Sequence, residues 1–169
     1  MTKQLPVRQY ASAGGVVVAD TGEHVLVLCR RERLGPRGRV ELRLPKGHIE
    51  PDEDPRQTAL REVREEAGLS PLNTVRDLGQ QVVEFNWRGY RYIRHESYFL
   101  LTTLPSTKFF EPEDQFERIW LLWDDALAQL TFEAEREWVR RAQSAWAVHS
   151  KNITEQYPKE SDNNPQVQK

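Results

Sequence analysis

The stretch Leu44–Leu69, LPKGHIEPDEDPRQTALREVREEAGL, combines a loop containing proline and glycine with strong helix signals. Asp54 is suited to the N-cap, with proline at the first helical position and Gln57 at the third, as in a capping box. Gly68 fits the left-handed position that follows many helices. The stretch therefore predicts a helix over residues 55–67 that is preceded by a loop.

The predicted helix carries an unusual cluster of acids. In an α-helix, which rotates by about 100° per residue, Glu62, Glu65 and Glu66 fall within an arc of roughly 100° on the helix surface. Like charges at this spacing repel by a few tenths of a kcal/mol per pair. A solvated surface helix whose acids are offset by Arg61 and Arg64 is one explanation. The other is a site for a hard divalent cation, because converging carboxylates are the ligands that Mg²⁺ prefers.

Composition limits the class of protein. A chain of 169 residues fits one domain with a real core, and a formal charge of −2 disfavours a protein that coats nucleic acid. There is no run of about 18 apolar residues for a membrane helix, and the first residues lack the apolar segment of a secretory signal. Cys29 is the single cysteine, which excludes an intrachain disulfide. We expect a cytoplasmic protein that acts on small molecules, away from membranes and nucleic-acid polymers.

The remaining sequence predicts strands alternating with helices. Strands are expected over residues 12–19, 24–30, 40–44, 74–86, 90–102 and 118–123, and further helical segments over 126–130 and 132–148. This order favours an α/β protein with a mixed sheet between helices. We expect a flexible lead-in over residues 1–8, a domain over 9–149, and a disordered tail over 150–169 that is almost free of aliphatic residues. The sequence leaves open whether the chain is a monomer or a homodimer.

The helix and the loop before it resemble a known family. Gly47, Glu53 and the run REVREEAGL over residues 61–69 match every defined position of the signature box of Nudix hydrolases, the MutT-type box. The resemblance extends over roughly residues 8–148. It implies the Nudix α/β/α sandwich, with a mixed sheet between helices. It also implies hydrolysis of a nucleoside diphosphate linked to another moiety, assisted by Mg²⁺ or Mn²⁺.

The resemblance also implies roles for the box residues. Three glutamates and one backbone carbonyl are the expected metal ligands: Glu62, Glu65, Glu66 and the carbonyl of Gly47. Arg61 would orient the ligand glutamates, Glu53 would steady the unit of loop and helix, and Gly68 would end the helix. Either Glu62 or a later acid would polarise the attacking water. The later candidates, Glu113, Asp114 and Glu117, are not separable in the sequence.

Several residues outside the helix are candidates for substrate contacts. Seven bases precede it, namely Arg30, Arg31, Arg33, Arg37, Arg39, Arg43 and Lys46. Surface solubility with pairing to Glu32 and Glu41 explains such a run as well as phosphate binding does. We predict phosphate contacts for Lys46, which adjoins Gly47, and for Arg43. His48 is either a phosphate contact or a loop residue, and Tyr90 either stacks on a base or packs on the sheet.

The substrate is suggested by residues outside the box. LPKGH over residues 44–48 and WDDALAQLTF over 123–132 resemble the dinucleoside polyphosphate hydrolases. Members specific for ADP-ribose tend to have a proline where this chain has Glu84 and Phe85. The sequence thus favours a dinucleoside polyphosphate such as diadenosine tetraphosphate. The alternatives are a MutT-like pyrophosphatase for nucleoside triphosphates, including oxidised ones, a diphosphoinositol polyphosphate hydrolase, and a domain that senses a nucleotide without cleaving it.

Overall fold

The computed structural model describes residues 5–36 and 38–156, and its strands form one mixed sheet. Five strands follow the order β3-β2-β1-β6-β5, with β4 paired to β1 and β7 paired to β2. β1 and β6 are parallel, and the other pairings are antiparallel. The strands are β1 (Val7–Val18), β2 (His24–Leu34), β3 (Val40–Arg43), β4 (Lys46–His48), β5 (Leu69–Trp87), β6 (Tyr90–Phe109) and β7 (Glu117–Leu122). The helices are α1 (Pro55–Ala67), α2 (Trp123–Gln129) and α3 (Glu133–Gln156).

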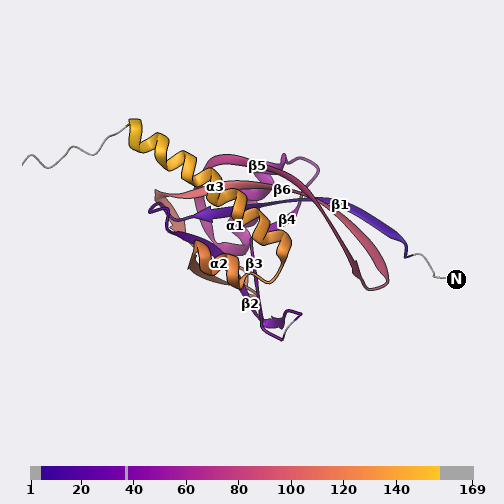
Figure 1. The fold of residues 1–169 in the computed structure, drawn as a ribbon. Coiled ribbons are helices and arrows are strands. Elements are labelled where there is room, and N and C mark those ends of the chain that lie inside the picture. Colours follow the sequence, from indigo (N-terminus) through magenta and orange to yellow (C-terminus); the bar gives the residue numbers. More distant parts are fainter. Residues whose placement is uncertain (1–4, 37, 157–169) are drawn as a thin grey trace, which may run out of the picture.

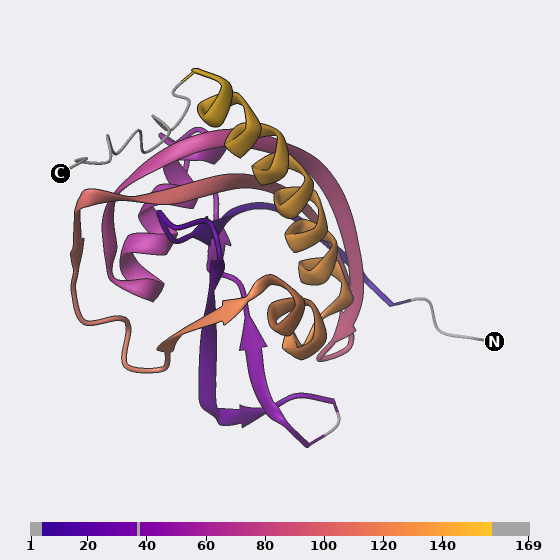
Figure 2. The ribbon, with the colours of Figure 1, turned by 60° about the vertical axis from the view of Figure 1, so that its left-hand side comes forward.

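Helices cover both faces of the sheet, as Figures 1 and 2 show. The side chains of β1 alternate between the two faces because successive residues of a strand point in opposite directions. Val16 belongs to the core cluster that includes Trp138 of α3 and Ala126 of α2. Val17 belongs to the cluster that includes Val63 of α1. The predicted α/β sandwich is confirmed.

Helix α1 has the predicted bounds, and local contacts explain why. The Asp54 side chain accepts a hydrogen bond from the backbone N–H of Gln57, and the Gln57 side chain accepts one from the N–H of Asp54. This reciprocal pair satisfies two donors that the first turn would leave unpaired. Gly68 ends the helix with φ 66°, and its N–H donates to the carbonyl of Arg64. The capping box and the glycine cap are both confirmed.

Several other boundaries were predicted wrongly, among them the start of β5 at Leu69 instead of residue 74 and the end of β2 at Leu34 instead of residue 30. β1 begins at Val7, inside the expected lead-in, and residues 46–48 form strand β4 where a loop was expected. β6 continues to Phe109 through the proline-containing segment, because Lys108 and Phe109 pair with the start of β5. These strands depend on partners far away in the sequence, so a local pattern does not reveal them.

The prediction of a disordered tail over residues 150–169 was wrong for residues 150–156. Residues 150–156 continue α3 as an exposed helix, in which Thr154 Oγ1 donates to the carbonyl of Ser150. A lack of aliphatic side chains shows that these residues are not buried, but it does not end a helix that packing has already nucleated. Residues 1–4 of the expected lead-in and 157–169 of the expected tail lie outside the described residues.

Two hairpins extend beyond the layered body. The hairpin of β2 and β3 projects at the bottom of Figure 2, and the tip of β5 and β6 projects at the right of Figure 1. Within residues 5–36 and 38–156, no helix is both long enough and apolar enough to cross a membrane.

Candidate active site

Arg61 connects the acids of α1 to the loop that precedes the helix. Its guanidinium donates to Glu53 Oε1 at 2.7 Å, to Glu62 Oε1 at 2.7 Å and to Glu65 Oε2 at 3.0 Å. It also donates to the backbone carbonyl of His48 at 3.1 Å. The planar guanidinium can hold several oxygens in a fixed arrangement. These bonds support the orienting role predicted for Arg61.

Glu53 is held between two donors of the helix. Its carboxylate accepts from Arg61 and from the hydroxyl of Thr58 at 2.7 Å. These hydrogen bonds lower the pKa of Glu53 to about 2. The carboxylate therefore stays charged across the physiological range and keeps the loop attached to α1, which agrees with its predicted steadying role.

Gly47 lies against the carboxylate of Glu62. β4 pairs with β1, and this pairing holds Gly47 opposite Ala13. A Cβ atom at position 47 would lie 1.9 Å from Glu62 Oε1, well inside contact distance. A side chain at this position would therefore displace the Glu62 carboxylate. Glycine at position 47 leaves room for the Glu62 carboxylate beside the backbone of β4.

Glu66 is tied to the other side of β4. Its Oε2 accepts the backbone N–H of Lys46 at 2.9 Å. Burial raises the pKa of Glu66 to about 7, and burial also raises the pKa of Glu62. For both carboxylates, burial disfavours the charged form more than the nearby positive charges and hydrogen-bond donors favour it.

The ammonium group of Lys46 points away from these acids and is buried. Its Nζ forms an ion pair with Glu135 Oε1 on α3, and Glu135 Oε2 accepts the backbone N–H of Leu44 at 3.1 Å. Burial lowers the pKa of Lys46, while Glu135 counteracts that effect. Glu135 thus fixes both ends of the segment just before Gly47, a role that no local sequence pattern predicts.

The carboxylates of α1 suit a divalent cation chemically. In residues 5–36 and 38–156 no three acidic, histidine or cysteine side chains are gathered closely enough to share an ion. Arg61 and the Lys46 N–H engage Glu62, Glu65 and Glu66 separately. Even so, the site offers hard oxygen donors, which fit Mg²⁺ or Mn²⁺. Two of them are buried carboxylates with raised pKa values, the third carboxylate is exposed, and the fourth donor is an adjacent backbone carbonyl. Glu62, Glu65, Glu66 and the Gly47 carbonyl would hold the ion.

A cavity of about 760 Å³ opens beside β4, between the two projecting hairpins and the start of α3. Its lining is rich in aromatic and basic side chains. The aromatic ones include Tyr10, Phe85, Trp87 and Tyr92, and the basic ones are Arg33, Arg43, Lys46, His48 and Arg94. The Tyr92 and Phe85 rings stack at 5.2 Å, and the Tyr10 and His48 rings stack at 4.6 Å. Such a lining offers partners for both a nucleobase and a phosphate chain.

The structure brings together some of the predicted substrate contacts. Arg43, Lys46 and His48 line this cavity, although the Lys46 ammonium is already paired. Tyr90 is absent from the described lining, and the Arg8 guanidinium lies 3.7 Å from its ring centroid. Tyr10 and Arg94 were not predicted from the sequence as substrate contacts. Alternation along β6 could have revealed Arg94, because it lies on the same strand face as Tyr92.

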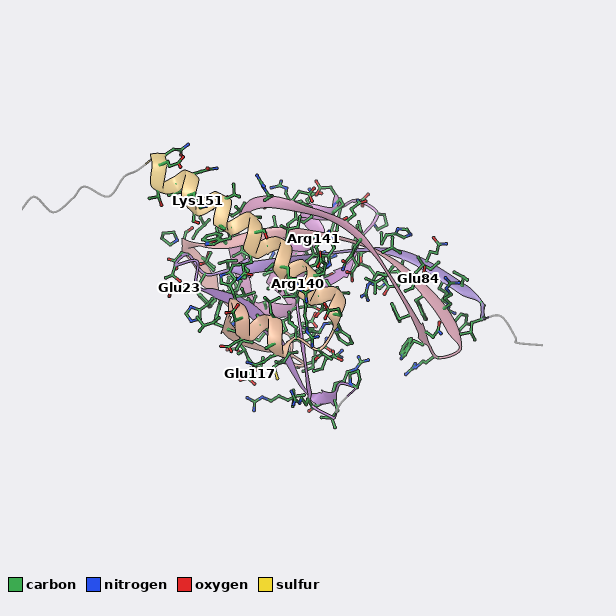
Figure 3. All side chains as sticks on the ribbon, viewed as in Figure 1. Glu23, Glu84, Glu117, Arg140, Arg141 and Lys151 are labelled. Carbon is green, nitrogen blue, oxygen red and sulfur yellow. The ribbon has the colours of Figure 1, made fainter. Side chains whose placement is uncertain are left out.

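The three late acids occupy different surroundings. The backbone N–H of Glu113 donates to the carbonyl of Glu65 at 3.2 Å, and its charge contributes to the raised pKa of Glu62. Asp114 lines a separate cavity beside β2. Glu117, labelled in Figure 3, is paired with Arg31. Of the three, Glu113 is electrostatically coupled to the acids of α1.

Comparison with known proteins agrees with the box and the fold. Residues 9–142 match the NUDIX domain family. The chain belongs to the Nudix family.

This Nudix chain is 32% identical over 127 residues to a mutator protein, MutT4, of Mycobacterium tuberculosis. The match covers 74% of the chain but only 51% of that relative, so the chain spans about half the length of the curated relative that it matches.

Solved structures share the fold of this Nudix domain. An Ap4A hydrolase of C. elegans in a binary complex is 20% identical with a TM-score of 0.59, covering 82% of this chain and 98% of that one. A MutT protein from Methanosarcina mazei is 22% identical with a TM-score of 0.57, covering 88% and 99%. At these identities the likeness concerns the fold.

Proposed function

We propose that this Nudix domain is a pyrophosphohydrolase that depends on Mg²⁺ or Mn²⁺ and cleaves a phosphoanhydride bond of a nucleoside polyphosphate. A dinucleoside polyphosphate such as diadenosine tetraphosphate is the favoured substrate. The observation that carries the proposal is the complete set of box glutamates beside a cavity lined by aromatic rings and guanidinium groups.

The residues of the chain divide the work as follows. Glu62, Glu65, Glu66 and the Gly47 carbonyl would bind the metal ion, which neutralises phosphate charge and favours ionisation of a water molecule. Arg61 keeps Glu62 and Glu65 in place through the bonds described above. Glu62 or Glu113 would accept a proton from the attacking water, and the coupling between these two acids supports Glu113 over the other late candidates.

The cavity supports a substrate with a base as well as a phosphate chain. Phe85, Tyr92 and Trp87 offer apolar ring faces on the β5–β6 hairpin, and Arg94 lies 5.2 Å from the Phe85 centroid. Arg43 and His48 line the same cavity as these rings, and His48 adjoins Gly47. A base stacked on the rings would direct its phosphates toward the metal ligands.

A MutT-like triphosphate pyrophosphatase is the second candidate, because the relatives with that name include both a sequence match and a structural match. A diphosphoinositol polyphosphate hydrolase would use the bases of the cavity but not its rings. A domain that only senses nucleotides would not need all three glutamates, and all three are present.

A substrate panel separates these candidates. The chain is incubated with Mg²⁺ or Mn²⁺ and with diadenosine tetraphosphate, ordinary and oxidised nucleoside triphosphates, or a diphosphoinositol polyphosphate, and the products are resolved by chromatography. We expect cleavage of the dinucleotide and its loss in Glu65→Gln. Turnover of triphosphates alone would favour the second candidate, and no turnover of any member would refute the proposal.

A further inference from the structure

Three arginines surround one buried carboxylate on the β2–β3 hairpin. Glu41 is 2% exposed, and it lies opposite Arg30 in the pairing of β2 with β3. Its Oε1 is 3.5 Å from Arg30 Nη1 and 3.7 Å from Arg43 Nη1, and its Oε2 is 3.3 Å from Arg33 Nε. We refer to Arg30, Arg33 and Arg43 around Glu41 as the arginine cluster.

The arginine cluster has more positive charge than its own acid can offset. One carboxylate faces three guanidinium groups, and the further partner of Arg30 is the neutral amide oxygen of Gln115 at 2.7 Å. Two other acids line the same cavity, but each is engaged elsewhere. Glu133 is paired with Arg136 and Arg140, and Glu84 is paired with Arg91. The cluster thus has one acid for three bases, and Glu135 and Glu66 add negative charge near Arg43.

The hydrogen bonds of the arginine cluster are incomplete as well. Glu41 Oε1 and Arg43 Nε are buried and have no hydrogen-bond partner among the described residues. Distances of 3.3 to 3.7 Å are longer than a good charged hydrogen bond. Arginines that served only to hold the hairpin would be expected to close these distances on Glu41. Guanidinium groups that are not closed on a carboxylate can instead donate to the oxygens of a phosphate group.

The arginine cluster is continuous with the candidate active site. Arg33, Glu41 and Arg43 line the same 760 Å³ cavity as His48, which adjoins Gly47. Arg30 lines the neighbouring cavity beside β2, and Arg33 lines both cavities. The Phe116 ring lies 5.5 Å from the Arg30 guanidinium and 5.9 Å from that of Arg43, and so it joins the two sides of the cluster. The side chain of Arg33 is 54% exposed and reachable by a ligand. A phosphate chain that starts at the glutamates would meet Arg43 first and Arg33 and Arg30 farther along.

We propose that the arginine cluster is a binding site for the distal phosphates of a long polyphosphate chain. The direction in which the polyphosphate chain would run rests on the proposed function, whereas the anion site itself does not. The site would select substrates by the number of phosphates, since a short chain held at the metal ligands would not reach Arg30 and Arg33. Arg37 belongs to the same basic run but lies outside the described residues.

Binding of inorganic tripolyphosphate to the full chain, measured by calorimetry in buffer without divalent metal, tests the anion site without any hydrolysis. The variants are Arg33→Gln and Arg30→Gln. Arg31→Gln is the matched control, because Arg31 lies on the same strand but is paired with Glu117 and not with Glu41. We expect each cluster variant to weaken tripolyphosphate binding about tenfold and the control to leave it unchanged. Thermal melting of each variant verifies that the fold is intact.

The outcomes distinguish this inference from the proposed function. Equal binding by Arg33→Gln, Arg30→Gln and Arg31→Gln, or no binding by the wild type, would overturn the anion site even if the enzyme hydrolyses nucleotides. A selective loss in the cluster variants would support it even if no member of the substrate panel is cleaved. Conservative Arg33→Lys keeps the charge without the guanidinium fork, so it should recover only part of the affinity.

Discussion

The ion pair between Lys46 and Glu135 gives the sharpest prediction for stability. Both side chains are buried, and Glu135 also accepts the backbone N–H of Leu44. Replacing Glu135 with alanine leaves an ammonium group buried without a partner, a change that costs about 3–5 kcal/mol. For a chain of this size the midpoint of thermal unfolding should fall by about 6–20 °C. Chemical denaturation monitored by tryptophan fluorescence measures the free energy of unfolding directly.

A control on the same helix makes this prediction specific. Glu133 is exposed and pairs with Arg136 and Arg140, so Glu133→Ala should lower the free energy of unfolding far less than Glu135→Ala does. The double variant Lys46→Met with Glu135→Leu removes both charges and should be more stable than Glu135→Ala. If Glu135→Ala is no more destabilising than Glu133→Ala, the buried pair does not hold the segment before Gly47, and the reasoning fails.

Three further predictions concern the unit of loop and helix. In Gly47→Ala the new Cβ would lie 1.9 Å from Glu62 Oε1 and displace that carboxylate. The affinity for Mn²⁺ and the rate of hydrolysis should therefore fall by about two orders of magnitude. A melting temperature similar to that of the wild type would show that the fold is kept. Gly68→Ala places a side chain at φ 66° and 2.3 Å from the Phe110 carbonyl. This change should lower the free energy of unfolding in denaturant by at least about 1–2 kcal/mol. An unchanged midpoint would contradict this prediction. The pKa of Glu53 is lowered from 4.5 to about 2 in the folded chain, so its contribution to stability is present above pH 4.5 and is lost as the pH falls toward 2. Glu53→Gln should flatten that part of the stability profile, and a profile identical to that of the wild type would count against the contact with Arg61.

The sequence by itself determined α1 and the set of acids that it presents. Asp54, Gln57 and Gly68 act within a few residues of one another, so the signals for the start and end of the helix are local and can be recognised before any fold is known. The same holds for Arg61, whose partners Glu53, Glu62 and Glu65 lie within eight positions. Pairing within one loop and one helix needs no knowledge of the sheet.

Only the tertiary structure decided how the rest of the site is assembled. Lys46 looked like a free phosphate contact, but its ammonium meets Glu135, which is 89 positions away in the chain and on the opposite helical layer. The arginine cluster depends on the pairing of β2 with β3, and the aromatic cavity depends on two hairpins and the start of α3. A run of arginines has the same sequence whether it faces water or a cavity. Long-range strand pairing and packing, which no local pattern contains, determine which of those side chains a ligand can reach.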